Sequence, residues 1–324
     1  MLEKKNQATT ANLTVNAVEK PSKSGKTMKK ILRNYELYLF ILPALLYFLI
    51  LHYGPMYGIQ IAFKNFMPTK GIWGSPWVGM KHFNNFFNSY YFSVLIKNTI
   101  GISVYSLVAG FPVPILLALM LNEVKGIRFK KLVQNVTYAP HFISTVVMAG
   151  MVVSFLSPSN GIVNEVIKAL GGEPISFMTN SSMFKNIYVW SGVWQGAGWG
   201  SIIYLATLAG IDPQLHEAAI VDGATRLQRI WYINIPGITP TMIIMLIMNC
   251  GSIMNVGFEK IFLLQNALNM EASDVISTYV YRIGLLNAQY SFSAAVGLFN
   301  SVINFALLII VNTISKRVSE TSLW

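Results

Sequence analysis

The sequence predicts an all-α integral membrane protein with six transmembrane helices and both termini in the cytoplasm. Three observations carry this prediction: a shortage of charged residues, six long apolar stretches, and an uneven distribution of lysine and arginine between the loops. Of the 324 residues, 53% are hydrophobic and 11% are charged, and the mean hydropathy is +0.50. A soluble domain usually carries about 25% charged residues, so the composition alone favours a membrane protein.

Six stretches are long enough to cross a bilayer, for which roughly 20 mainly apolar residues are needed. The first of them contains Pro43 near its start and a Gly54–Pro55 break. Bulky residues stand where a signal peptide would have its small-residue cleavage site, so we interpret this stretch as an uncleaved anchor. The six predicted spans are residues 37–62, 99–121, 136–156, 187–210, 238–257 and 292–315.

The positive residues set the predicted orientation. Sixteen of the 24 Lys and Arg residues fall in four segments, namely 1–34, 122–135, 211–237 and 316–324. Cytoplasmic segments usually carry the excess of positive charge, so we place these four on the cytoplasmic side.

The chain is thereby divided into four segments, each with a predicted structure. Residues 1–34 form a basic cytoplasmic arm, which we predict to be disordered. Residues 35–97 hold the first transmembrane helix and an outer loop rich in aromatic residues. Residues 98–315 hold the other five spans and a polar loop, and residues 316–324 form a cytoplasmic tail.

Two readings of the aromatic outer loop at 64–97 stay open. It forms an interfacial helix within an aromatic belt, or it provides a docking surface for an outer partner, and both can hold. The net charge of +11 does not indicate nucleic acid as a partner, because the positive residues cluster beside apolar spans. The single cysteine, Cys250, and four scattered histidines show no metal-ligand spacing.

The predicted spans are nearly free of ionisable residues. Proton-driven carriers usually keep such residues within the bilayer, and an intramembrane enzyme would need an acid, a base or a metal there. The spans argue against both classes, so a partner must supply the energy for uphill transport. Neutral polar and aromatic residues remain, and they form either helix contacts or a path suited to sugars. The residues of this possible path are Trp194, Gln195, Trp199, Asn249, Ser252 and Asn255.

The polar loop at 211–240 is predicted to form two short helices joined by a sharp turn. Asp212 is a good N-cap, Pro213 suits the first helical position, and Asp222–Gly223 is a turn signal. We expect a partly apolar knob from which Glu217, Arg226 and Arg229 point outward. Such a knob suits docking on a protein. The alternative is an amphipathic hairpin on the membrane surface, where acidic residues fit poorly beside anionic lipids.

This loop, which reads "EAAIVDGA" and later "INIPGITP", resembles the EAA loop of the membrane subunits of binding-protein-dependent ABC importers. One departure is Ile235 before the proline, where that family usually has leucine. The stretch "LPALLYFLILHYGPMYGIQIAFKNF" and the closing "SLW" are similar to the subgroup that imports complex carbohydrates, including plant cell-wall and alginate oligosaccharides. The residues assigned to the ATPase-coupling loop are Glu217, Ala218, Ala219, Asp222, Gly223, Ala224, Arg226 and Pro236.

The resemblance implies a type I ABC importer permease fold in a bacterial cell membrane, with no catalytic residues in this chain. It implies a pore of two related membrane subunits, usually a heterodimer, above two ATPase subunits that bind ATP and Mg²⁺. A solute-binding protein outside the membrane would deliver the sugar or oligosaccharide, and this chain would bind no cofactor. The alternatives are a stand-alone channel or carrier for a neutral polar solute, and an intramembrane enzyme.

Overall fold

The computed structural model of the protein describes residues 33–319, and these residues are almost entirely helical. The one strand-like feature among them is an isolated bridge between Lys64 and Trp77. The all-α prediction is therefore confirmed for this range. Most of the predicted arm at 1–34 and the end of the predicted tail at 316–324 lie outside the described residues.

The chain divides into two compact units between Gly58 and Ile59. The described part of the first unit is one apolar helix, which continues through the predicted Gly54–Pro55 break. Proline lacks the N–H of an α-helical bond and its ring crowds the preceding turn, and here that turn is widened into a π-helix. The segments are α2 (Tyr35–Tyr47), π-helix η1 (Phe48–Tyr53), α3 (Gly54–Met56) and the start of 3₁₀-helix η2 (Tyr57–Phe63).

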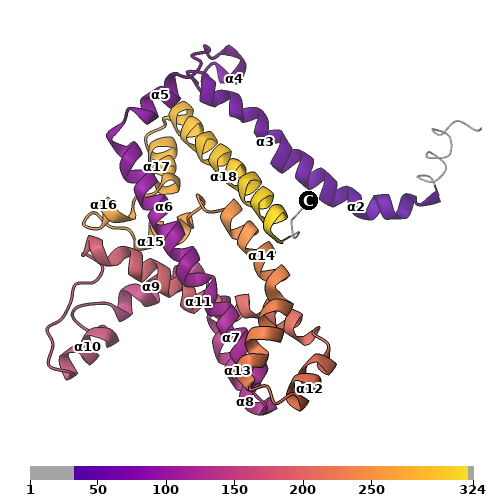
Figure 1. Cartoon of the computed structure of the whole chain (residues 1–324). Coiled ribbons are helices and arrows are strands. Elements are labelled where there is room, and N and C mark those ends of the chain that lie inside the picture. Colours follow the sequence, from indigo (N-terminus) through magenta and orange to yellow (C-terminus); the bar gives the residue numbers. More distant parts are fainter. Residues whose placement is uncertain (1–32, 320–324) are drawn as a thin grey trace, which may run out of the picture. The chain divides into compact units, whose positions relative to one another are not determined.

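The second unit holds all the remaining helices (Figure 1). Its first half comprises α4 (Gly71–Gly74), α5 (Lys81–Phe87), α6 (Tyr90–Gly110), α7 (Pro112–Glu123), α8 (Ile127–Tyr138), η3 (Ala139–Phe142), α9 (Thr145–Phe155), α10 (Ile162–Ala169) and α11 (Ser181–Ala209). Its second half comprises α12 (Pro213–Val221), α13 (Arg226–Arg229), η4 (Ile230–Asn234), α14 (Ile235–Gly251), α15 (Phe258–Leu264), α16 (Met270–Ser273), α17 (Ile276–Tyr281), η5 (Arg282–Leu286) and α18 (Tyr290–Ser319).

Four described helices are long and apolar enough to cross a membrane. They correspond to the first, second, fifth and sixth predicted spans. A fifth is present if a bent pair of helices counts as one span. The remaining predicted span, 187–210, lies within the 29-residue α11, whose glycine, serine and amide residues make it less apolar. The four helices are Tyr35–Phe63, Tyr90–Glu123, Arg226–Gly251 and Tyr290–Arg317.

The third predicted span is not one straight helix. The helices Ile127–Phe142 and Thr145–Phe155 meet at an angle of 102°. Ser144 separates them in an extended conformation, and its hydroxyl accepts a hydrogen bond from the N–H of Val147. A serine in this position caps a new helix, and Pro140 disfavours continuation of the old one. The apolar stretch at 136–156 therefore contains a corner.

Helix α11 is central to the second unit and packs against α6, α7, α8 and α14. Gly198 permits the closest approach, because a Cβ atom there would lie 2.0 Å from the carbonyl oxygen of Thr137. A Cβ atom at Gly200 would lie 3.2 Å from Pro114, whereas one at Gly196 would meet nothing within 4 Å. Two of these three glycines thus bring helices together, as small residues do at membrane helix contacts.

The short helices of several loops lie at two ends of the second unit, whereas α10 and α16 lie between these ends (Figure 1). Figure 1 shows α8, α12 and α13 together at the lower end, and α4 and α5 at the opposite end. The loops around 122–135 and 211–237, which the charge pattern assigns to one side, are thus close in space. This arrangement agrees with the predicted orientation, which itself stays a prediction.

The aromatic outer loop contributes to the core as well as to the surface. Phe86 of α5 is fully buried and forms edge-to-face contacts with Phe292 and Phe299 of α18. Trp73 and Trp77, by contrast, are largely exposed. Part of the loop's aromatic content is therefore explained by packing, and the exposed tryptophans suit the predicted interfacial belt.

Candidate functional site

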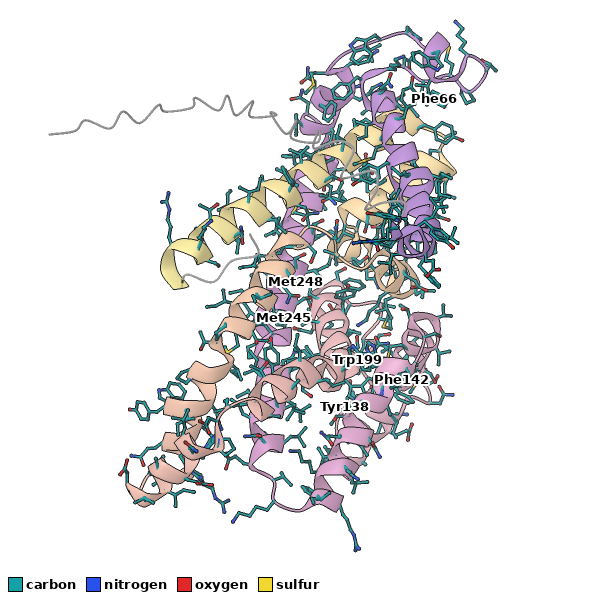
Figure 2. The ribbon with its side chains drawn as sticks, turned by 90° about the vertical axis from the view of Figure 1, so that its right-hand side faces the viewer. Phe66, Tyr138, Phe142, Trp199, Met245 and Met248 are labelled. Atoms are coloured by element: carbon teal, nitrogen blue, oxygen red, sulfur yellow. The ribbon has the colours of Figure 1, made fainter. Side chains whose placement is uncertain are left out.

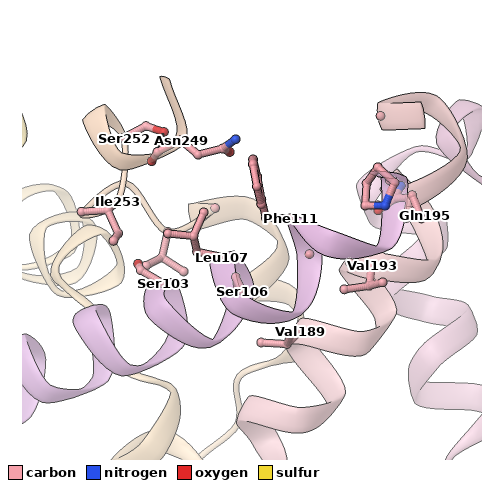
Figure 3. Close-up of a pocket in the computed structure, with 18 of the residues that line it drawn as sticks. Ser103, Ser106, Leu107, Phe111, Val189, Val193, Gln195, Asn249, Ser252 and Ile253 are labelled. Carbon is pink, nitrogen blue, oxygen red and sulfur yellow. Dashed lines mark hydrogen bonds between the residues drawn. The ribbon is translucent and has the colours of Figure 1, made fainter. Parts of the chain in front are cut away.

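A cavity of about 500 Å³ lies between α6–α7, α11, the end of α14 and the segment that leads into α15 (Figure 3). Its walls are mixed. Ser103 and Ser106 come from α6, Phe111 from the α6–α7 junction, and Val189 and Val193 from α11. Small apolar groups with a few polar ones are typical of small-molecule sites.

Four of the six predicted path residues line this cavity, namely Gln195, Asn249, Ser252 and Asn255. Figure 3 shows Asn249 and Ser252 on one side of it and Gln195 on another. Trp194 and Trp199 do not belong to its lining. Trp194 is 49% exposed, and the assignment of all six residues to a substrate path stays a prediction.

Trp199 belongs to a separate aromatic cluster. Its ring stacks on His141 with centroids 4.4 Å apart and planes 4° apart. Phe142 meets the same ring edge-on at 5.8 Å, and Figure 2 shows these two side chains next to each other. The cluster holds the corner of η3 against α11, which gives Trp199 a structural role.

The amide side chains of the cavity are held by hydrogen bonds. Nε2 of Gln195 donates to the carbonyl oxygen of Ile143 at 2.9 Å, and Nδ2 of Asn249 donates to that of Met245 at 2.7 Å. These bonds leave the amide oxygens of Gln195 and Asn249 as acceptors for a ligand hydroxyl. The oxygen of Asn255 accepts from Asn300 and Asn304, at 3.0 Å in each case, and this network joins the segment between α14 and α15 to α18.

Sequence reasoning missed one residue of the cavity, Lys260. The charge pattern only places Lys260 outside the four predicted cytoplasmic segments. It is 9% exposed and is the one Lys, Arg, Asp or Glu among the described residues that line the cavity. Its ammonium donates to the carbonyl oxygen of Tyr188 at 2.9 Å and lies 4.8 Å from the centre of that ring. Burial lowers the pKa of Lys260 to about 8.

The first half of the polar loop folds as predicted. Asp212 caps α12 by accepting a hydrogen bond from the N–H of Gln214 at 2.9 Å, and Pro213 is the first helical residue. The helix ends at the predicted turn, where Gly223 has φ +78°. Glycine adopts this backbone conformation without the steric cost that a side chain brings.

The second half of the loop differs from the prediction. Thr225 and Gln228 form a capping box that starts a new helix. This helix is not short, because Arg226–Gly251 is one continuous apolar helix. Pro236 and Pro240 therefore lie within this continuous helix. The turn at Gly223 is thereby joined to the fifth predicted span by a helix that begins at Arg226.

The residues assigned to the coupling loop are mostly exposed. Glu217, Ala218, Asp222, Gly223, Arg226 and Pro236 are exposed, and Ala219 and Ala224 are half-buried. Glu217 and Arg226 make no ion pair with any described residue. Arg229 differs from expectation, because it is half-buried and its Nε is enclosed without a hydrogen-bond partner in the described range.

Large apolar side chains surround these charges. Val221 is 88% exposed and Leu227 is 78% exposed. Exposed large apolar side chains next to charged ones are typical of a protein–protein contact. The loop therefore has the composition of a docking surface, as the sequence predicts.

Apolar helices, a cavity of mixed polar and apolar lining between them and an exposed knob at one end define a multi-pass membrane protein with a solute-sized cavity. Its sequence gives a more specific assignment. The chain belongs to the family of binding-protein-dependent transport system inner membrane components, whose pattern matches residues 110–320.

Two relatives from Bacillus subtilis (strain 168) span nearly the whole chain. The polygalacturonan/rhamnogalacturonan transport system permease protein YteP is 42% identical over 94% of this chain and 95% of its own length. Protein LplB is 41% identical over 92% of this chain and 93% of its own.

A solved structure has a similar fold. It is a chain of a bacterial ABC transporter involved in the import of the acidic polysaccharide alginate, with a TM-score of 0.85 and 45% identity. The similarity covers 91% of this chain and 99% of that one. A second structure of a bacterial alginate ABC transporter, in complex with an alginate pentasaccharide-bound periplasmic protein, is 44% identical, also with a TM-score of 0.85.

Proposed function

We propose that this chain is the membrane-spanning subunit of an ATP-driven importer and forms half of the translocation path for an oligosaccharide. Family membership establishes the chain as a permease subunit of a binding-protein-dependent system. The proposed substrate class is supported mainly by the cavity, where amide oxygens and hydroxyl groups lie among apolar groups. Hydroxyl-rich ligands with apolar C–H faces suit such walls.

The relatives support the same substrate class. YteP is named for polygalacturonan and rhamnogalacturonan, and the structurally similar chain belongs to a transporter named for alginate. More distant ones are named for arabinooligosaccharides and multiple sugars. An oligosaccharide is thus common to most of these systems, and the similarity over nearly the whole chain supports the transfer.

The proposed assembly contains this chain, a second homologous permease subunit that forms the other half of a heterodimeric pore, and two ATPase subunits. ATP and Mg²⁺ bind to the ATPase subunits, and this chain has no catalytic role. A solute-binding protein delivers the sugar from outside, as supported by the alginate transporter solved with its periplasmic protein. In this arrangement all six predicted spans cross the bacterial cell membrane and both termini are cytoplasmic.

The proposed coupling runs through the loop at 211–240. Glu217 is exposed on α12 and has no partner within the described chain, so it is free to pair with an arginine of the ATPase. The turn at Gly223 transmits movement of α12 to Arg226–Gly251, whose far end carries Asn249 at the cavity. ATP-driven closure of the ATPase pair thereby opens the path by rigid-body motion.

Two serine variants test the path. Ser252 lines the cavity and Ser301 is exposed, and both donate to carbonyl oxygens of their own helices. Ser252→Leu should fill the cavity and lower oligosaccharide uptake by the reconstituted complex, whereas Ser301→Leu should not. Uptake is measured with a panel of neutral and acidic oligosaccharides. Normal uptake by an assembled Ser252→Leu complex would show that the cavity is not part of the translocation path.

A further inference from the structure

A second pocket, of about 450 Å³, lies between the first part of α6, the first part of α11 and α16. Its lining is strongly polar, in contrast to that of the central cavity. Two lysines enter it from different helices, Lys97 from α6 and Lys185 from α11. The other polar lining residues are Asn98, Ser181, Ser182 and Glu271.

The two lysines are not neutralised by the chain itself. Neither Lys97 nor Lys185 forms a hydrogen bond or an ion pair with another described residue, and neither does the carboxylate of Glu271. The amide of Asn98 is occupied, because it donates to the carbonyl oxygens of Glu271 and Asp274. Two positive groups with one carboxylate leave the pocket with a net positive charge.

The ammonium of Lys185 lies over the backbone of α6. A Cβ atom at Gly101 would be 3.1 Å from its Nζ. Burial, and secondly the charge of Lys97, lower the pKa of Lys185. The ammonium of Lys185 thus lies between α6 and α11. A bound anion would offset the electrostatic repulsion between Lys185 and Lys97.

A third lysine continues this line into the central cavity. A Cβ atom at Gly192 would lie 3.2 Å from Nζ of Lys260. Lys185 precedes Gly192 by seven residues on α11, which corresponds to about 10 Å along a helix. On α6, Gly101 beside Lys185 is followed by Ser103 of the cavity wall. Lys97 and Lys185 thus line the second pocket and Lys260 lines the first, two helical turns further along α11, and we call these three residues the lysine row.

We propose that the lysine row binds the carboxylates of an acidic, uronate-containing oligosaccharide as it enters the cavity. This inference rests on the proposed function and narrows its substrate. Lys260 is nine-tenths buried with one hydrogen bond, so two of its three donors remain for a ligand. An enclosed ammonium without a counter-charge is costly, and a neutral sugar would leave that cost in place.

Lysine is well suited to a path, as opposed to a fixed site. Its ammonium is a point charge on a flexible stem, whereas arginine imposes the geometry of a planar fork. Carboxylates on successive sugar units could exchange between the three ammonium groups without a large change in orientation. The row thus favours acidic chains without holding them in one pose.

The test compares two substrates of equal length in the complete reconstituted transporter. One is a trigalacturonate, and the other is the same trisaccharide with its carboxyl groups reduced to alcohols. The double variant Lys97→Met with Lys185→Met should raise the KM for the acidic substrate about tenfold or more, the loss expected for a charged hydrogen bond. Lys185→Arg retains the charge and should recover part of this loss.

Lys168→Met is the matched control, because Lys168 is exposed and already paired with Glu165 at 2.8 Å. Binding of each trisaccharide to the solute-binding protein is measured separately. A difference in delivery by that protein can then be distinguished from a difference in translocation through the permease. An unchanged KM for the acidic substrate in the assembled double variant would overturn the proposal, as would equal losses for the acidic and reduced substrates. Absence of any oligosaccharide uptake by the parent complex would instead contradict the proposed function.

Discussion

Replacement of Gly198 by alanine tests how α11 is packed. The added Cβ atom would lie 2.0 Å from the carbonyl oxygen of Thr137, 2.3 Å from its carbonyl carbon and 2.9 Å from the nitrogen of Tyr138. All three atoms belong to the backbone, so no side-chain rotation can relieve the overlap. An ordinary van der Waals contact begins at 3.4 Å. To accommodate the added Cβ atom, α8 and α11 would have to separate by more than ~1 Å in a closely packed region.

The magnitude follows from two opposing effects. Alanine is about 1 kcal/mol better than glycine inside a helix, whereas overpacking of a tight contact costs about 1–3 kcal/mol and occasionally more. With backbone on the opposing side, the cost exceeds the gain and Gly198→Ala should be destabilising. Gly196→Ala is the matched control, because its Cβ atom would meet nothing within 4 Å and only the helix-propensity gain applies.

Thermal unfolding of the purified complex in detergent, followed by tryptophan fluorescence, measures the difference. We predict a lower Tm for Gly198→Ala and an unchanged or higher Tm for Gly196→Ala. Equal Tm values for the two variants would refute the close contact between α11 and the end of α8.

Three further predictions concern the turn, an ion pair and the topology. Gly223 has φ +78°, a conformation that asparagine tolerates and valine does not. Gly223→Val should therefore reduce co-purification of the ATPase, whereas Gly223→Asn should retain it. Equal co-purification with both variants would show that coupling does not require a positive φ at this residue. Asp274 is 4% exposed and pairs with Arg282, so Arg282→Ala should cost about 3 kcal/mol by leaving a buried charge unpaired. An unchanged Tm would contradict this prediction. In a Cys250→Ala background, an impermeant thiol reagent should label the exposed site of Thr69→Cys from outside cells and that of Lys125→Cys only after lysis. The reverse pattern would overturn the orientation.

Local signals in the sequence predicted the parts of the structure that local contacts determine. The Asp212 cap, the Pro213 start and the turn at Gly223 all have their expected conformations. Each depends on hydrogen bonds or backbone sterics within a few residues. The close approach at Gly198 also follows from residue size, although the sequence could not identify Thr137 as the opposing residue.

Features that depend on neighbouring helices were beyond sequence reasoning. The sequence groups Trp194 and Trp199 with the possible path, but only packing decides which side of α11 meets the cavity. The corner at Ser144 lies within a mainly apolar stretch, where Pro140 was the available signal. The sequence does not show that Lys260 is buried, because its packing against Tyr188 is a tertiary contact.

The central claim is that the knob at 211–240 couples this permease to an ATPase. Glu217 is exposed on α12 and unpaired within the described chain. A charged hydrogen bond from it to a partner arginine would contribute about 1.5–3 kcal/mol.

The most direct measurement is ATP hydrolysis by the reconstituted complex with and without sugar-loaded binding protein, for the parent and for Glu217→Lys. The account predicts that Glu217→Lys weakens ATPase association, and that sugar-stimulated hydrolysis and uptake fall together. A Glu217→Lys complex that assembles normally and keeps its full stimulated hydrolysis would contradict the account.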